Sequence, residues 1–212
     1  MQTDHPHMTA APEIEPIAPG VSIWRAYDQS VKAELFSTAL QTGAGTYLVD
    51  PIPLDEEAIE ELSADHKVIG IVVTNENHER AAARFAKRFG VSIHLHADLI
   101  DAMALPAVIG LRDGATLARG VKAVEIEGAA AGEIALLSDA GSGTMVIGDA
   151  LINFEPYGFA LLPAKYCTNQ KEMRASLARL LDFNFDRMLF AHGLPILSDA
   201  RQRLKLLLQE HG

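Results

Sequence analysis

The 212-residue sequence is poor in cysteine and in positive charge. Cys167 is its single cysteine, so an intramolecular disulfide is excluded and a reducing compartment is favoured; we expect a cytoplasmic protein. Lys and Arg number 18 against 28 Asp and Glu, a net charge of −10 that disfavours nucleic acids and anionic membrane surfaces as partners. No apolar run approaches the roughly 20 residues that span a bilayer, so no membrane segment is expected.

The first nineteen residues also lack what a secretory signal needs, namely a basic start and an apolar centre. Pro, Ala and Glu dominate there, a composition that favours a flexible N-terminal tail over residues 1–19 followed by a single domain over residues 20–212. His5 and His7 lie in this tail, where solvated side chains are expected rather than a metal site.

The remainder is typical of a globular protein, with 49% hydrophobic and 22% charged residues. Branched and aromatic runs predict strands, and apolar residues at helical spacing predict helices. Strands are expected at 21–27, 33–40, 46–49, 67–73, 91–96, 115–118, 121–127, 132–139, 143–151 and 185–190, and helices at 54–65, 79–89, 169–181 and 198–210. The chain thus contains two β-rich halves, each followed by helices, which can pack sheet on sheet with the helices outside.

Three polar stretches fall at the ends of predicted strands, at residues 74–80, 148–153 and 191–196. Junctions of this kind are where α/β proteins usually place their functional groups. Asp149 follows Gly148 at a strand end and has no evident packing role, so it is expected to line a pocket.

In their order and spacing these stretches resemble the metallo-β-lactamase superfamily. The resemblance covers roughly residues 20–210 and implies an α/β fold, a four-layer αββα sandwich. Five motifs carry it: Leu-Val-Asp-Pro at 48–51, the apolar strand ending in Thr74, Gly-Glu-Ile-Ala-Leu at 132–136, Gly-Asp at 148–149 and His-Gly-x-Pro at 192–195.

Most of the metal ligands of that family are missing here. Active members carry His-x-His-x-Asp-His after the Thr and a further His before the Gly-Glu-Ile-Ala-Leu strand. The resemblance places those ligand positions on Asn75, Asn77, Glu79, Arg80 and Ala129. Only Asp149 and His192 match the family outright. Amides are poor zinc ligands and a guanidinium has no lone pair to donate, so a dizinc centre and its cofactors are not expected.

Arg80 offers an electrostatic replacement for the metal. We hypothesise that its guanidinium bonds Asp149 and Glu79, with His192 alongside, because unpaired buried carboxylates are costly. The chain would then be a metal-free relative that binds an unknown small molecule or a partner, with Asn75, Asn77, His78 and Tyr157 also lining the pocket.

Two enzymatic alternatives stay open. One is a hydrolase with a single zinc, manganese or iron ion held by Glu79, Asp149 and His192, with His78 swinging inward to join them. The other is a metal-free acid/base pair of Asp149 and His192. For His78 itself, an exposed position at a helix start is the favoured interpretation.

The remaining candidates are interpreted as structural. His94 and His96 alternate on one strand and are expected to lie away from the pocket. Cys167 is expected to be a small residue near a helix start, because no base can be assigned to it. Residues 153–170, which include Tyr157, are predicted to be a long irregular loop, either a lid over the pocket or a contact in a homodimer.

Overall fold

The computed structural model describes residues 9–64 and 66–210. A seven-stranded sheet holds the strands of the N-terminal half in sequence order, antiparallel from β1 to β4 and parallel from β4 to β7. Its strands are β1 (Glu15–Ala18), β2 (Val21–Asp28), β3 (Ala33–Thr42), β4 (Gly45–Val49), β5 (Val68–Val72), β6 (Ile93–His96) and β7 (Val108–Leu111).

The second sheet has five strands in the order β14-β11-β10-β9-β8, of which only β11 and β14 pair in parallel. Its strands are β8 (Thr116–Ala118), β9 (Val121–Glu125), β10 (Ile134–Ser138), β11 (Thr144–Ile147) and β14 (Arg187–Phe190). A separate antiparallel hairpin pairs β12 (Leu151–Phe154) with β13 (Gly158–Leu161).

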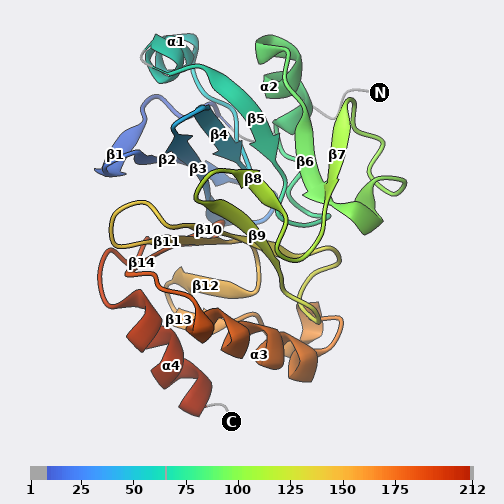
Figure 1. The fold of residues 1–212 in the computed structure, drawn as a ribbon, viewed down its shortest axis with the longest axis vertical. Coiled ribbons are helices and arrows are strands. Elements are labelled where there is room, and N and C mark those ends of the chain that lie inside the picture. Colours follow the sequence, from blue (N-terminus) through green and yellow to red (C-terminus); the bar gives the residue numbers. More distant parts are fainter. Residues whose placement is uncertain (1–8, 65, 211–212) are drawn as a thin grey trace.

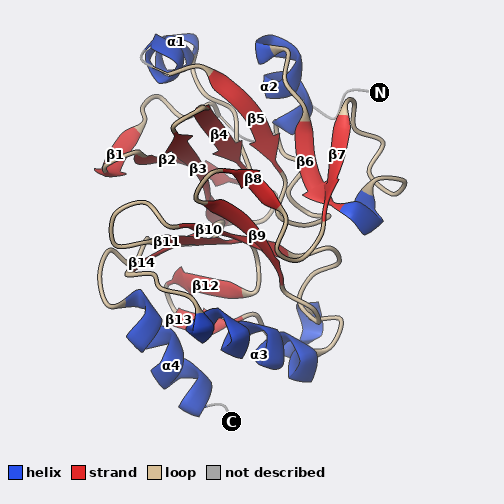
Figure 2. Ribbon diagram, in the orientation of Figure 1, coloured by secondary structure: helices blue, strands red, loops and turns tan. Residues whose placement is uncertain are grey.

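Helices cover the outer faces of both sheets (Figures 1 and 2). The helices are α1 (Glu56–Ala64), α2 (Ala82–Phe89), α3 (Gln170–Arg179) and α4 (Ala200–Glu210), with short 3-10 turns at Ala97–Leu99, Ala164–Tyr166 and Leu180–Asp182. In Figure 1, α1 and α2 lie above the first sheet, whereas β12, β13, α3 and α4 lie below the second. The expected four-layer αββα sandwich is therefore confirmed.

Three buried apolar clusters separate these four layers. Trp24 and Phe85 belong to the cluster under α1 and α2, Leu40 and Ile134 to the one between the sheets, and Leu177 to the one against α3 and α4. All five residues of β4 are buried, as are four of the five in β5, because central strands of a layered sheet are covered on both faces.

The part of the expected N-terminal tail that the structure describes is docked rather than free. Ala11 is 1% exposed and its amide donates to the Pro53 carbonyl at 3.0 Å. β1 then pairs with β2 at the edge of the first sheet. The apolar side chains of Ile14 and Ile17 pack on the buried clusters, which explains why this segment joins the fold. His5 and His7 lie outside the described residues.

Residues 153–170 are not the irregular loop that was predicted. The β12–β13 hairpin and a 3-10 turn occupy most of this segment, and residues 155–157 form the turn at the tip of the hairpin. Pro156 and Gly158 made the segment look irregular because both residues favour turns. Tyr157 lies at the tip, 60% exposed, with its ring edge-on to Phe154.

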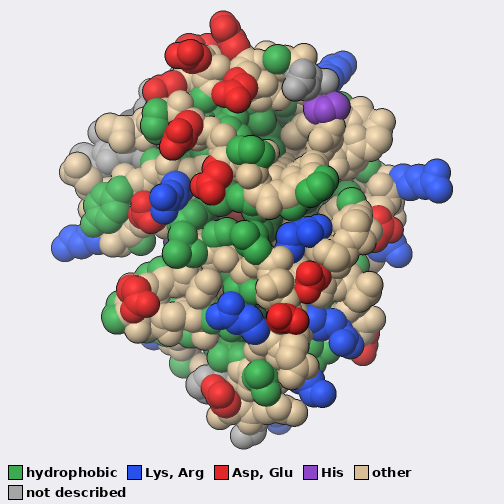
Figure 3. All heavy atoms as spheres, turned by 90° about the vertical axis from the view of Figure 1, so that its left-hand side faces the viewer, with side chains coloured by type: hydrophobic (Ala, Val, Ile, Leu, Met, Phe, Trp, Pro, Cys, Tyr) green, Lys and Arg blue, Asp and Glu red, His purple; other side chains and the backbone are tan. Residues whose placement is uncertain are grey.

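Charge is unevenly spread over the surface. On the face drawn in Figure 3, Asp and Glu side chains gather at the top, the end of the molecule that carries α1. Lys and Arg are more frequent in the lower half of that face. Within residues 9–64 and 66–210, no helix combines the length and the apolar character that crossing a bilayer demands.

Candidate functional site

Three loops that follow parallel strands meet at one end of the sandwich. The turn after β5 carries Thr74 to Arg80, the bend after β11 carries Asp149, and the bend after β14 carries His192. The first of these strands belongs to the seven-stranded sheet and the other two to the five-stranded sheet, so the site lies where the two sheets meet.

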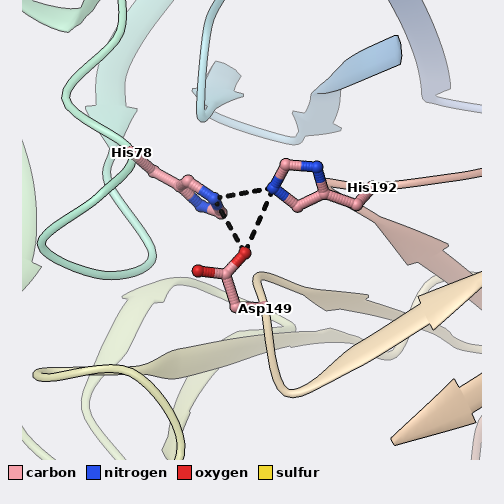
Figure 4. A group of neighbouring side chains, drawn as sticks. All are labelled: His78, Asp149 and His192. Atoms are coloured by element: carbon pink, nitrogen blue, oxygen red, sulfur yellow. Dashed lines mark hydrogen bonds and ion pairs between the residues drawn. The ribbon is translucent and has the colours of Figure 1, made fainter. Parts of the chain in front are cut away.

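His78, Asp149 and His192 each contribute one atom that can bind a metal ion, and these three ligand atoms form a triangle (Figure 4). Nε2 of His78 lies 3.1 Å from Oδ1 of Asp149, Nε2 of His192 lies 3.2 Å from the same oxygen, and the two nitrogens are 3.4 Å apart. The side chain of His78 is 3% exposed and that of His192 is 21% exposed, so the triangle opens to solvent on the His192 side.

Asp50 and Thr74 hold His78 in this position. Nδ1 of His78 lies 2.9 Å from Oδ2 of Asp50, and the amide and hydroxyl of Thr74 both donate to the same carboxylate. An Nδ1–H that donates to a carboxylate leaves Nε2 facing the triangle. His78 is therefore a buried residue of the site, and the interpretation as an exposed helix-start histidine was wrong. The alternative in which His78 turns inward beside Asp149 and His192 describes its position instead.

The electrostatics of the triangle favour one positive charge within it. Burial lowers the pKa of His78, but the carboxylates of Asp149 and Asp50 outweigh this effect and raise that pKa to about 9. Burial would raise the pKa of Asp149, yet His78 and His192 hold it well below its usual range. Burial lowers the pKa of His192. A proton on His78 or a bound cation would each offset negative charge of Asp149 and Asp50.

The donor set fits a single metal ion. Two imidazole nitrogens and one carboxylate oxygen are a usual set of protein ligands for catalytic zinc, which keeps a fourth position open. Ligand atoms about 2.1 Å from a tetrahedral ion lie about 3.4 Å from one another. The three edges of 3.1, 3.2 and 3.4 Å are close to that spacing, and the partial exposure of His192 leaves an open side.

Glu79 does not belong to this donor set. Its side chain is partly exposed, and the described part of the chain contains no hydrogen bond or ion pair that involves its carboxylate. The three-residue group that could hold a metal contains His78 in place of Glu79, together with the expected Asp149 and His192.

Arg80 is buried, but it does not bond Asp149 or Glu79 as hypothesised. Its guanidinium donates to the carbonyls of Phe36 at 2.6 Å, Asp50 at 3.0 Å and Ala191 at 3.3 Å. Carbonyls at the ends of buried strands need donors, and this requirement decides where the side chain points. The charge of Arg80 still acts on the site, because it helps to lower the pKa of Asp50.

Asn75 and Asn77 lie beside Asp149. Asn75 is fully buried, and its Nδ2 donates to Asp149 Oδ2 at 3.2 Å and to Glu133 Oε2 at 2.6 Å. Asn77 is exposed and its Nδ2 lies 3.4 Å from the same oxygen of Asp149. Tyr157 packs on Phe154 instead; within the described residues it makes no hydrogen bond to the triangle.

Sequence reasoning missed Glu133 as a site residue. Its carboxylate is 2% exposed and accepts from the Ala150 amide at 3.1 Å as well as from Asn75. Burial and the charge of Asp149 raise the pKa of Glu133 to about 8. The signal that could have identified Glu133 is a charged residue type directly before β10, a strand whose residues are all buried.

The two strand histidines lie apart from the triangle, as the structural interpretation predicted. Nε2 of His96, on β6, lies 2.9 Å from the carboxylate of Glu125, on β9, and so links the two sheets. His94 packs edge-on against Tyr47. The thiol of Cys167 contacts the carbonyls of Leu162 and Pro163 and the sulfur of Met173, where the described residues supply no base.

Comparisons with known proteins identify the fold. The family model described as "Metallo-beta-lactamase superfamily" matches residues 17–210. The DIM-1 metallo-beta-lactamase superposes with a TM-score of 0.72 at 13% identity, covering 97% of this chain and all of that one. A metallo-beta-lactamase family protein from Thermus thermophilus gives 0.68 at 20% identity, with 92% and 80% covered. The FIM-1 enzyme from Pseudomonas aeruginosa in its mono-zinc form gives 0.69 at 13% identity, with 98% of both chains covered.

No curated protein matches the chain. The family match extends over nearly the whole sequence and agrees with the layered fold. The chain belongs to the metallo-beta-lactamase superfamily.

Proposed function

We propose that the chain is a hydrolase of small molecules that works with one divalent metal ion held by His78, Asp149 and His192. The observation that carries this proposal is the triangle of donor atoms, whose edges of 3.1 to 3.4 Å match the spacing of ligands around one ion. A divalent ion there would supply Lewis acidity and activate a water molecule for attack.

The residues around the triangle have distinct tasks in this proposal. Asp50 fixes the tautomer of His78, because the Nδ1–H that it accepts leaves Nε2 free to act as a ligand. His192 forms the open edge through which a substrate would enter. Asn77 is exposed beside Asp149, and its amide can donate a hydrogen bond to an oxygen of the substrate.

A site for one ion is favoured over a site for two. A second ion would need further lone-pair donors, and the positions where the family resemblance expects them are Asn75, Asn77 and Ala129. Neutral amides bind zinc weakly, and an alanine side chain has no donor at all. Substrate classes for a first screen are esters, thioesters, lactams and phosphodiesters, which a Lewis acid and an activated water can cleave.

Metal analysis tests the proposal directly. Protein purified without added metal or chelator should contain, or take up from zinc, manganese or iron(II), about one equivalent of ion. His78→Ala and His192→Ala should lose at least about tenfold in affinity, because each removes one of three ligands. His66→Ala removes an exposed histidine outside the triangle and should bind metal like the natural protein.

A metal-free binding protein is the second candidate. The contacts of His78 favour it, because its two nitrogens lie 2.9 Å from Asp50 and 3.1 Å from Asp149, so a protonated ring can pair with both carboxylates without an ion. Failure of the natural protein to take up any of the three metals would reject the hydrolase proposal and favour a relative without a metal centre that binds a small molecule.

A further inference from the structure

Glu133 is a buried residue with a carboxyl group that the triangle itself does not use. It stands before β10, and both of its carboxylate oxygens accept hydrogen bonds, Oε1 from the Ala150 amide and Oε2 from Nδ2 of Asn75. Buried carboxylates are uncommon unless their oxygens are satisfied by donors. Its partners are Ala150, the residue after Asp149, and Asn75, whose side-chain amide contacts Asp149. Glu133 therefore acts on the site through these two residues.

The orientation of the Asn75 amide is fixed by its surroundings. Oδ1 accepts from the backbone amide of Asn77 at 2.9 Å, which turns Nδ2 toward the two carboxylates. Nδ2 carries two hydrogens, one for Glu133 and one for Asp149, so both bonds can form together. A fully buried amide whose donors and acceptor are all satisfied resists reorientation.

As a result, the two oxygens of Asp149 face different partners. Oδ1 faces the imidazoles of His78 and His192, whereas Oδ2 faces the amide nitrogens of Asn75 and Asn77. The N–H groups of these amides carry partial positive charge, so a cation is disfavoured beside Oδ2.

Close packing fixes this arrangement further. A Cβ at Gly148 would lie 2.5 Å from Oγ1 of Thr74, 2.8 Å from Oε1 of Glu133 and 3.1 Å from Nδ2 of Asn75. The side chains of the network therefore fill the space beside the backbone just before Asp149.

We propose that Glu133 is a positioning residue: it holds the Asn75 amide against Oδ2, so that Asp149 would bind an ion through Oδ1 while the amide itself restricts the site to one ion. This inference rests on the proposed single-ion site. Glu133 touches neither the substrate nor the metal in this account, and its effect passes entirely through the amide of Asn75.

Two substitutions that keep the shape of the side chain test the contacts from Glu133 through Asn75 to Asp149. Each variant is titrated with cobalt(II), whose visible spectrum reports the coordination around the ion. Glu133→Gln replaces one of the two accepting oxygens with an amide nitrogen, which cannot accept the hydrogen bond from Asn75 or from the Ala150 amide. The side chain of Asn75 is then held less firmly. We expect one equivalent of cobalt, bound about tenfold more weakly and with an altered spectrum. Asn75→Asp removes the N–H groups that bond Glu133 and Asp149 and leaves only the Asn77 amide beside Oδ2, so we expect a second equivalent to bind.

The matched control is Glu125→Gln, which alters a carboxylate that bonds His96 away from the triangle. It should leave cobalt affinity and spectrum unchanged. If Glu133→Gln does not fold, Glu133→Asp keeps the carboxyl group but shortens the side chain, and it should show the same weakening. Cobalt binding and spectra equal to those of the natural protein in the Glu133 and Asn75 variants would overturn the inference.

A measurement on the metal-free protein separates this inference from the proposed function. The side-chain amide resonances of Asn75 should shift in Glu133→Gln and stay in place in Glu125→Gln. Unshifted resonances would overturn the positioning role whether or not the protein binds metal. If the resonances shift but the natural protein takes up no ion, the proposed function and the single-ion restriction are rejected, and only the contact through Asn75 stands.

Discussion

At the scale of single residues, Arg80 shows how a buried cation can serve structure next to a candidate site. Its guanidinium joins the carbonyls of three segments, Phe36 in β3, Asp50 after β4 and Ala191 after β14. Asp50 orients His78, and Ala191 precedes His192. Arg80 therefore fixes the backbone on both sides of the triangle, although it touches none of the three donor atoms.

Substitution of Arg80 by alanine should lower the free energy of unfolding by about 3–5 kcal/mol, because it leaves buried carbonyls without donors and carboxylates without a nearby cation. Urea unfolding followed by circular dichroism measures this loss. Arg84→Ala, in the helix that follows, is the control, since its ion pair with Glu56 is exposed and should contribute less than about 1 kcal/mol. Equal losses for the two variants would show that the carbonyl bonds contribute little.

At the scale of elements, the β12–β13 hairpin supports the bend that carries His192. The Asn153 amide donates to the His192 carbonyl at 3.1 Å, and the Leu194 amide donates back to the Asn153 carbonyl at 2.9 Å. This close approach requires a glycine between them: a Cβ at Gly193 would lie 2.1 Å from the Asn153 carbonyl oxygen, and its φ is +112°. The hairpin and the bend are thus one unit.

Gly193→Ala should separate the hairpin from the bend. We expect a loss of about 2–4 kcal/mol in the free energy of unfolding, within the range of severe backbone substitutions, and weaker metal binding because His192 is displaced. Gly158→Ala at the hairpin tip is the control: its φ is +61°, but nothing lies within 4 Å of the added Cβ. It should cost about 1–2 kcal/mol from backbone strain alone and leave metal affinity unchanged. Equal metal affinity in both variants would contradict the coupling.

At the scale of the whole molecule, the triangle spans the two halves of the sandwich. His78 follows a strand of the seven-stranded sheet, and Asp149 and His192 follow strands of the five-stranded sheet. An ion bound there would link two sheets that otherwise meet through an apolar layer and a few polar contacts such as His96 with Glu125. Binding to the folded state alone stabilises it by mass action.

Zinc at about 100 times its dissociation constant should therefore add about 2.7 kcal/mol to the stability of the folded state. For a domain of this size, that gain raises the melting temperature by about 5–11 °C, measurable by calorimetry, and a chelator should reverse it. His192→Ala should show no such rise at the same zinc concentration. A similar rise in that variant would place the stabilising ion elsewhere.

Much of the fold followed from local patterns. Long apolar runs predicted the buried strands. Amphipathic runs predicted the helices, one ending at Gly90 and another beginning near Asn169, and the structure confirms these layers. The first error was the docked segment around Ala11 and β1, where a composition rich in Pro and Glu hid a few buried apolar contacts. The second was the β12–β13 hairpin, whose turn residues made residues 153–170 look irregular.

The αββα architecture and the place of Asp149 and His192 at strand ends could be predicted from the amino-acid sequence, because strand periodicity and turn residues are local properties. The expectation that no dizinc centre forms also rests on residue types alone, since amides are poor zinc ligands, and it stays a prediction. The folded chain was needed to show that His78 faces inward, that Arg80 bonds carbonyls and that Glu133 reaches Asp149 through Asn75. Each of these depends on which side chain fills a space between segments far apart in the chain, and no short pattern encodes that.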